Sequence, residues 1–396
     1  MREVVVVSAM RTPIGTFGGT LASFSAVDLG VKAVEGLIVR AGVSKEMIEE
    51  VIIGNVLSAG KGQNVARQVA VHAGLPFSVP ASTVGNVCGS GMKAVINGVQ
   101  AILSGDREVV LVGGTESMSQ AGYVSSDSRW GMRMGHSQLT DTILSDGLTD
   151  AFSGIHMGIT AENLAERFHI SREEQDAFAL NSQEKALRAI ENHQFEEEIV
   201  PITIQQKKKA PFDMTTDEGP RAGLSLEKLG NLKAVFKADG TVTAGNASGI
   251  NDGAAMLLLM SKEKAETLGI SYMATIKSYA FEGVEPDIMG YGPVVSTRKA
   301  LDKIGMCIKE IDLVESNEAF AAQSLTVAAE LGLDLEKTNI YGGAIALGHP
   351  IGASGARILT TLLHGLEANK AKTGLATLCV GGGMGVSMIV ERKESN

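Results

Sequence analysis

The sequence has few cysteines, few aromatic residues and no long apolar run. Its 396 residues include three cysteines, and 4% of its side chains are aromatic. Three cysteines in so long a chain make no disulfide framework, which indicates a reducing compartment. No apolar run approaches the roughly 18 residues that a membrane span needs. The scarcity of aromatic side chains leaves little surface on which nucleic-acid bases could stack.

The sequence also has fewer basic than acidic residues, 35 against 45, which gives a formal net charge of −10. An acidic balance argues against nucleic acid or an anionic membrane as the main partner. The N-terminus, M-R-E-V-V-V-V, reads directly as a strand without a signal peptide, and the final K-E-S-N is not a peroxisomal signal. We therefore expect a soluble cytoplasmic protein. Its length and its 44% hydrophobic content are typical of a globular chain with two or more domains.

Short β-branched runs alternate with segments of helical periodicity, which predicts an α/β fold with mostly buried strands. The predicted strands are residues 3–8, 50–53, 108–112, 254–260, 274–280 and 375–380. The predicted helices are residues 27–40, 89–104, 319–331 and 354–368.

The chain also repeats itself faintly. Residues 42–51 align without gaps on residues 305–314, and S-G-M-K at 90–93 matches S-G-A-R at 354–357. This predicts two copies of one α/β unit packed face to face in a layered core, the first at 1–120 plus 248–270 and the second at 271–396. Residues 121–247 break the pattern, with a helical section at 159–192. We expect them to form an inserted loop domain that covers one face of the core and contacts ligands and other subunits.

Two cysteines and one histidine lie in glycine-rich surroundings. Cys88, in N-V-C-G-S-G, is placed at a strand-to-helix turn, where the helix N-terminus would lower the pKa of its thiol. His349, in A-L-G-H-P, fits an acid, a base or an oxyanion donor. Cys379 ends an apolar run before three glycines. Two thiols and an imidazole among glycines are the groups needed for acyl transfer through a covalent thioester.

Each of these residues also has a purely structural interpretation. Cys88 could be a packed cysteine at a helix start, and Cys379 alone is more typical of a core cysteine. His349 could be a hydrogen-bonded loop residue, and Asn317 a simple helix cap. Cys307 is assigned to packing. A metal site is not expected because the cysteines and His349 lack close-pair spacing, and no G-K-[ST] follows the glycine clusters.

Taken together, these segments resemble the thiolases, in particular the biosynthetic acetoacetyl-CoA thiolases (acetyl-CoA C-acetyltransferases). The resemblance runs over nearly the whole chain. The motifs that carry it are residues 11–15, 86–91, 156–162, 240–249, 252–255, 317–321, 342–355 and 379–385.

The resemblance implies a duplicated α/β thiolase fold with a loop domain, usually a homotetramer. It implies that two acetyl-CoA condense to acetoacetyl-CoA and CoA, reversibly, through an acetyl group on Cys88. Cys379 corresponds to the base, and His349 to the histidine beside the nucleophile. Asn317 corresponds to the asparagine that holds a water, and the N–H groups of Cys88 and Gly381 to the oxyanion hole.

In the family the CoA thioesters are substrates, so the resemblance implies no cofactor. Eight further positions fall where the family contacts CoA or shapes the acyl pocket. The loop that contains Arg221 is variable in the family. The eight positions are Leu148, His156, Met157, Arg221, Ser248, Met289, Ala319 and Phe320.

Three alternatives stay open at this point. A degradative 3-ketoacyl-CoA thiolase would accept longer chains, which the bulky Met157 and Met289 argue against. A decarboxylating or hydroxymethylglutaryl-type condensing enzyme of the same fold would lack a second cysteine such as Cys379. A non-catalytic acyl-CoA carrier would be expected to have lost Cys88, His349 or Cys379.

Overall fold

One large mixed sheet organises the protein. The computed structural model describes residues 2–393, in which ten strands form a sheet of order β12-β13-β14-β11-β1-β10-β5-β3-β4, with the short β2 paired to β10. This confirms the predicted α/β class. The strands are β1 Val4–Arg11, β2 Gly15–Thr16, β3 Glu50–Gly54, β4 Ala81–Val84, β5 Val109–Ser117, β10 Asn251–Ser261, β11 Ala274–Gly283, β12 Leu313–Ser316, β13 Thr373–Val380 and β14 Met384–Arg392.

The two ends of this sheet follow the same plan. Strands β3 and β5 pair in parallel, as do β12 and β13, and each pair continues into two antiparallel neighbours. The two halves meet where β1 and β11 run antiparallel, with Val5 opposite Thr275 and Val6 opposite Ala274. The strand order is therefore repeated about this junction, and the sheet is continuous across it.

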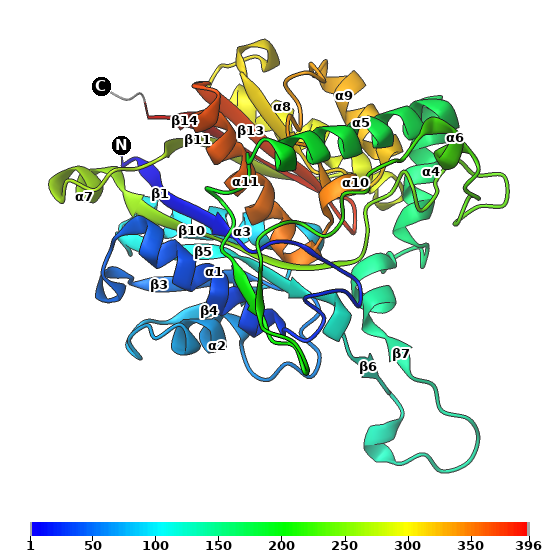
Figure 1. The fold of residues 1–396 in the computed structure, drawn as a ribbon, viewed down its shortest axis with the longest axis horizontal. Helices are drawn as coiled ribbons and strands as arrows, with labels where there is room; N and C mark the ends of the chain where they lie inside the picture. The colour runs from blue at the N-terminus through cyan, green and yellow to red at the C-terminus, as the bar shows by residue number, and fades with distance from the viewer. Residues whose placement is uncertain (1, 394–396) are drawn as a thin grey trace.

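Helices form layers around the sheet. In Figure 1 the first half of the sheet, with its helices, lies below the second half. Helices α1 (Ala26–Ala41) and α2 (Val65–His72) pack on the outer face of the first half. Helix α8 (Gly292–Asp302) packs on the second half, and α9 (Ala321–Leu331) packs on α8. Between the halves lie α3 (Ser90–Ser104) and α11 (Ile351–Ala368), whose apolar side chains share one cluster with strands of both halves. Every residue of α11 from 351 to 366 is buried, as expected of a central helix.

The central helices approach each other at two glycines. A Cβ atom on Gly355 would lie 2.5 Å from the backbone nitrogen of Met92, and one on Gly91 would lie 2.9 Å from that of Ala356. These glycines belong to the matching S-G pairs at 90–91 and 354–355. Backbone therefore lies directly on backbone where the helices cross, because neither glycine carries a side chain.

The segment 121–247 lies beside this core. It contains the hairpin β6–β7 (Tyr123–Val124, Thr140–Asp141), helices α4 (Met157–Arg167), α5 (Arg172–Glu191) and α6 (Leu226–Gly230), and the hairpin β8–β9 (Ile202–Ile204, Phe212–Met214). The helical section predicted at 159–192 is two helices. The chain turns at His169, whose φ is +53°, and Ser171 then caps α5 with Glu174 in a capping box. Two further short helices are α7 (Lys262–Thr267) and α10 (Ala344–Leu347).

Two further observations qualify the sequence predictions. Cys307 is exposed and precedes a short 3₁₀ turn, Ile308–Glu310, so its assignment to packing was wrong. No helix among residues 2–393 is long and apolar enough to cross a membrane.

The helix crossing predicts the effect of one added methyl group. Gly355→Ala places a Cβ against the backbone of Met92, and such overpacking costs about 1–3 kcal/mol. We expect the melting temperature to fall by several degrees in a thermal scan. Gly230→Ala is the matched control, because its Cβ would meet no atom within 4 Å. Equal melting temperatures for the two variants would contradict a close helix contact.

Candidate active site

The turn that carries Cys88 is strained. Between β4 and α3 the chain passes through Val87 at φ +42°, a left-handed conformation that β-branched residues rarely adopt. The hydroxyl of Ser90 stabilises the turn: it accepts a hydrogen bond from the N–H of Asn86 at 2.8 Å and donates one to the carbonyl of Val87 at 2.7 Å. Strain of this kind persists where the surroundings fix the backbone, and it is frequent at functional sites.

Glycines bring this turn against the second half. A Cβ on Gly89 would lie 2.8 Å from Val380, and one on Gly381 would lie 3.1 Å from Val87. Cys379 is next to Val380 at the end of β13 and is fully buried. It is also close enough to Cys88 for a charge on that thiol to raise its pKa. The structure therefore brings the two predicted cysteines into one site.

His349 completes the arrangement from the loop before α11. Its Nε2 lies 3.3 Å from the Sγ of Cys88, and its Nδ1 lies 2.6 Å from the Oγ of Ser354. Its backbone N–H donates to the amide oxygen of Asn251 on β10 at 2.9 Å. The side-chain nitrogen of Asn317 lies 3.5 Å from Nδ1, and the oxygen of that amide has no partner among residues 2–393. An imidazole held in this position can exchange a proton with the thiol.

Burial sets the charge of the three groups. It raises the pKa of the Cys88 thiol to about 11, although the N–H groups of Gly381 and of Cys88 itself act in the opposite direction. Burial also raises the pKa of Cys379 and lowers that of His349 to about 3, with a further contribution from Arg357. The helix start was expected to lower the pKa of Cys88, but desolvation outweighs it. At neutral pH the site therefore holds two thiols and an uncharged imidazole.

A cavity of about 440 Å³ opens onto Cys88 and His349. All eight residues predicted from the resemblance to contact CoA or shape the acyl pocket line it: Leu148, His156, Met157, Arg221, Ser248, Met289, Ala319 and Phe320. The structure thus places them together, while their individual roles stay predictions. Cys379 lies behind the wall of the cavity, packed in one cluster with Met157, Met289, Ala319 and Phe320.

Sequence reasoning missed several residues of the site. Phe236 lines the cavity and stacks on His156 with ring centroids 4.6 Å apart. A Cβ on Gly158 would lie 2.2 Å from the Phe236 ring, which explains the glycine that follows His156-Met157. Ser354 and Asn251, which hold His349, were also missed. A lone aromatic residue in a polar segment and a helical serine carry no signal that distinguishes them from packing residues.

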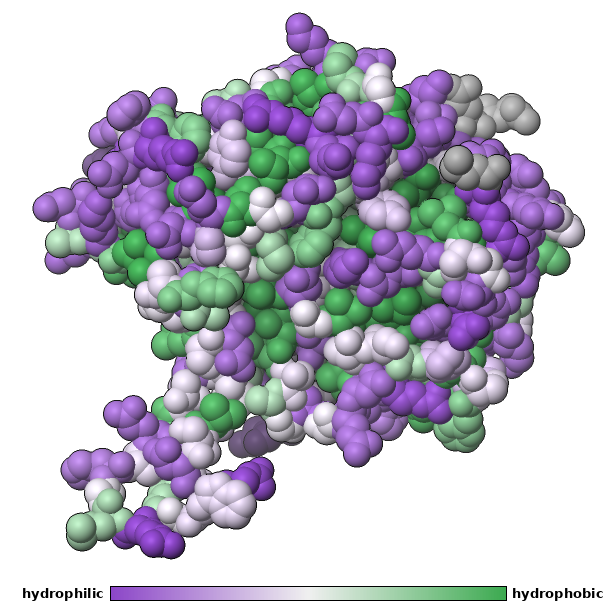
Figure 2. All heavy atoms as spheres, turned by 180° about the vertical axis from the view of Figure 1, so that it is seen from behind, coloured by the Kyte–Doolittle hydropathy of each residue, from purple (hydrophilic) through white to green (hydrophobic). Residues whose placement is uncertain are grey.

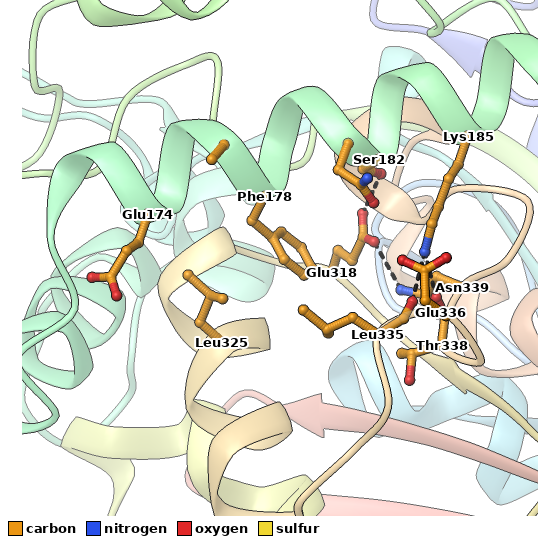
Figure 3. Close-up of a pocket in the computed structure, with 12 residues that line it drawn as sticks. Glu174, Phe178, Ser182, Lys185, Glu318, Leu325, Leu335, Glu336, Thr338 and Asn339 are labelled. Carbon is orange, nitrogen blue, oxygen red and sulfur yellow. Dashed lines mark hydrogen bonds between the residues drawn. The ribbon is translucent and has the colours of Figure 1, made fainter.

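A second cavity, of about 340 Å³, lies between α5 and α9, and the buried Glu318 is one of the residues that line it (Figure 3). Glu318 accepts hydrogen bonds from Ser182 at 2.7 Å, from Asn339 at 2.8 Å and from the N–H of Ile345 at 3.2 Å. Glu318, the residue after Asn317, is therefore tied to α5 through Ser182 and to α10, which precedes His349, through Ile345. This contact is structural, and it supports the first site from behind.

A thiol next to an imidazole, with a second thiol behind them, fits the site of an acyl-transfer enzyme. Residues 4–263 match the family described as "Thiolase, N-terminal domain", and residues 270–392 match "Thiolase, C-terminal domain". The chain therefore belongs to the thiolase family, and it is an acyltransferase. The family predicted from the motifs is confirmed.

Individual relatives cover the whole chain. The sequence is 56% identical over 392 residues to an acetyl-CoA acetyltransferase of Pseudomonas aeruginosa, covering 99% of this chain and 100% of that protein. It is 54% identical to a probable acetyl-CoA acyltransferase of Staphylococcus aureus, with the same coverage. Among solved structures, the Bacillus anthracis acetyl-CoA acetyltransferase superposes with a TM-score of 0.97 at 46% identity. The human mitochondrial 3-ketoacyl-CoA thiolase superposes with 0.96 at 43% identity, and each covers 99% of both chains. The thiolase-like fold is thereby confirmed.

Proposed function

We propose that this thiolase is an acetyl-CoA C-acetyltransferase, which condenses two acetyl-CoA into acetoacetyl-CoA and CoA and catalyses the reverse thiolysis. The observation that carries the proposal is the 3.3 Å contact between Cys88 and His349 at an apolar cavity, with Cys379 buried beside it. Two relatives named acetyl-CoA acetyltransferase support it, since their sequences are 56% and 55% identical to this one over 99% and 98% of the chain.

In the first half-reaction, Cys88 gives its proton to Nε2 of His349 while its sulfur attacks the thioester carbon of acetyl-CoA. The carbonyl electron pair moves to oxygen, and the N–H groups of Cys88 and Gly381 stabilise the oxyanion. The bond to the CoA sulfur then breaks. CoA leaves with the proton of the Cys379 thiol, so that an acetyl group is bonded to Cys88, Cys379 is a thiolate and His349 is protonated.

In the second half-reaction, the Cys379 thiolate takes a proton from the methyl carbon of the next acetyl-CoA. The protonated His349 donates a hydrogen bond to the enolate oxygen, and Asn317 positions a water beside it. The enolate carbon attacks the acetyl carbon on Cys88 and the bond to Cys88 breaks. Cys88 leaves with the proton from His349, which restores two thiols and a neutral imidazole. The protons balance, so the reaction needs no cofactor besides its CoA substrates.

The walls of the cavity set the length of the acyl group. Met157 and Met289 are almost completely buried and pack with Phe320 and Cys379 in one cluster. Bulky side chains at the end of an acyl pocket exclude additional methylene groups by overlap. We therefore place the enzyme with the short-chain biosynthetic thiolases and not with the degradative ones. We further propose a cytoplasmic location, since all three cysteines are free thiols.

We also propose that the protein is a homotetramer. The hairpin β6–β7 projects from the body of the molecule, in Figure 1 and from behind in Figure 2. Its loop exposes large apolar side chains, with Trp130 87% and Met134 101% exposed and Met132 and Leu139 at 60% and 68%. Apolar side chains gathered on a projecting arm are typical of an assembly contact.

The division of roles between the cysteines predicts different defects. Cys379→Ser should still form acetyl-Cys88 from acetyl-CoA, detected by mass spectrometry, because CoA can also leave as its thiolate. The variant should lose condensation by several orders of magnitude, because it has no thiolate base. Cys88→Ala should lose both, and Cys307→Ser, at an exposed cysteine, should lose neither. Condensation at the wild-type rate by the Cys379 variant would show that this residue only packs.

Chain length distinguishes the proposed function from its rival. We expect kcat/KM for thiolysis to fall by at least about tenfold from the four-carbon to the eight-carbon 3-oxoacyl-CoA, because the bulky side chains of Met157 and Met289 line the cavity. Met289→Ala should raise the eight-carbon rate. Comparable values for both substrates in the wild-type enzyme would favour a degradative thiolase.

Removing the apolar side chains of the hairpin should weaken assembly. We expect the triple variant Trp130→Ser, Met132→Ser, Met134→Ser to have a smaller mass than the wild-type tetramer in light scattering. Val39→Ser, which removes an equally exposed apolar side chain from α1, is the control. A tetrameric triple variant, or a monomeric wild-type protein, would contradict the proposal.

A further inference from the structure

We propose that Ser354 is a positioning residue that holds His349 in the tautomer whose Nε2 faces Cys88 without a proton. Ser354 lies in the first turns of α11, behind the imidazole ring, and it does not line the acyl cavity. The inference rests on the proposed role of His349 as the base that takes the proton of Cys88.

The hydrogen bonds around Ser354 determine where its proton goes. The hydroxyl lies 2.9 Å from the carbonyl oxygen of Pro350, which can only accept, so the hydroxyl proton is used there. The same oxygen lies 2.6 Å from Nδ1 of His349 and must therefore accept from it. With the proton on Nδ1, the neutral ring has its lone pair on Nε2, which faces the Cys88 sulfur.

Asn317 acts on the same ring nitrogen. Its amide nitrogen also approaches Nδ1, at 3.5 Å, and an amide N–H can only donate. Without the Ser354 oxygen, this donor would favour the tautomer with the proton on Nε2. In that tautomer the ring offers Cys88 a donor and cannot accept its proton.

The backbone of His349 is also held in place. Asn251, on a strand of the first half, accepts the backbone N–H of His349 and donates to the carbonyl of Gly15 at 3.0 Å. Gly348, at φ +113°, gives Asn251 the space to do so, since a Cβ there would lie 2.5 Å from its amide carbon. Asn251 thus restrains the backbone of His349, while the oxygen of Ser354 accepts from its ring.

Ser354 has a counterpart in the internal repeat. Ser90 occupies the matching position in S-G-M-K, and its hydroxyl fixes the turn of Cys88. In the second half, Ser354 likewise donates its hydroxyl proton to a carbonyl at the helix start, that of Pro350. Its oxygen, however, accepts from the imidazole of His349 and not from a backbone N–H. One duplicated residue thus orients both reacting groups.

The test measures the proton transfer without CoA substrates. Alkylation of Cys88 by iodoacetamide, followed by peptide mass mapping on the full-length protein, reports the availability of its thiolate. Around pH 7.5, Ser354→Ala should slow alkylation by about tenfold or more. The difference should shrink as pH rises towards the Cys88 pKa of about 11, because the thiol then ionises without a base. The charged groups that act on the pair, Arg357 and Glu116, are present in every variant.

Three variants separate positioning from packing. Thr360→Val removes a hydroxyl that donates to the carbonyl of Ala356 at 2.9 Å on the same helix, and it should alkylate at the wild-type rate. Ser354→Thr and Ser354→Val have the same shape and differ in the hydroxyl, so only the valine variant should be slow. This pair decides the question even if Ser354→Ala folds poorly.

Several outcomes would overturn the proposal. It is overturned if Ser354→Ala is alkylated at the wild-type rate across the pH range. It is also overturned if the threonine and valine variants react at equal rates, or if Thr360→Val is as slow as Ser354→Ala. His349→Asn gives the rate without any base. If it is not slow, His349 is not the base and the proposed function fails with it. If it is slow while the Ser354 variants are normal, only the positioning role fails.

Discussion

The active site depends on the contact between the backbones of α3 and α11. Gly91 is the second residue of α3, and Gly355 is the fifth of α11, so the helices touch near their N-terminal ends. The residues just before those ends are Cys88 and His349. A short distance between thiol and imidazole follows from the crossing, because a side chain at either glycine would separate the helices. The two halves of the sheet then enclose the crossing, and the side chains around it are buried.

This enclosure changes the electrostatics of the thiol. A helix N-terminus in water would stabilise a thiolate, but here desolvation opposes every charge in the site. The uncharged resting state fits the proposed chemistry, since Cys379 first has to be an acid and only later a base. The backbone N–H groups near Cys88 are already in place, so that they can stabilise negative charge once the substrate brings it.

Much of the fold and of the site could be predicted from the sequence. Runs such as residues 254–260 and 354–368 are long and strongly patterned, and they form β10 and α11 as expected. Strand β4 was missed because it is short and half exposed, and α8 because its glycine and proline start resembles a turn. The motifs predicted Cys88, His349 and Cys379 as site residues, and the structure brings these three side chains together. Ser354 and Phe236 were not predicted, because their importance lies in which atoms they touch, and distances across the fold are absent from local patterns.

The repeated strand order, joined at the antiparallel contact of β1 and β11, has a consequence for ancestry. Two identical copies of one half, related by a two-fold axis at that contact, would place identical loops on both sides of the helix crossing. Such a pair would hold two thiols or two imidazoles, but not one of each. Fusion into a single chain removes this symmetry constraint, so that one loop could keep the nucleophile while the other acquired its base. The pairing of Cys88 with His349 is in this sense a division of labour between two copies that are no longer identical.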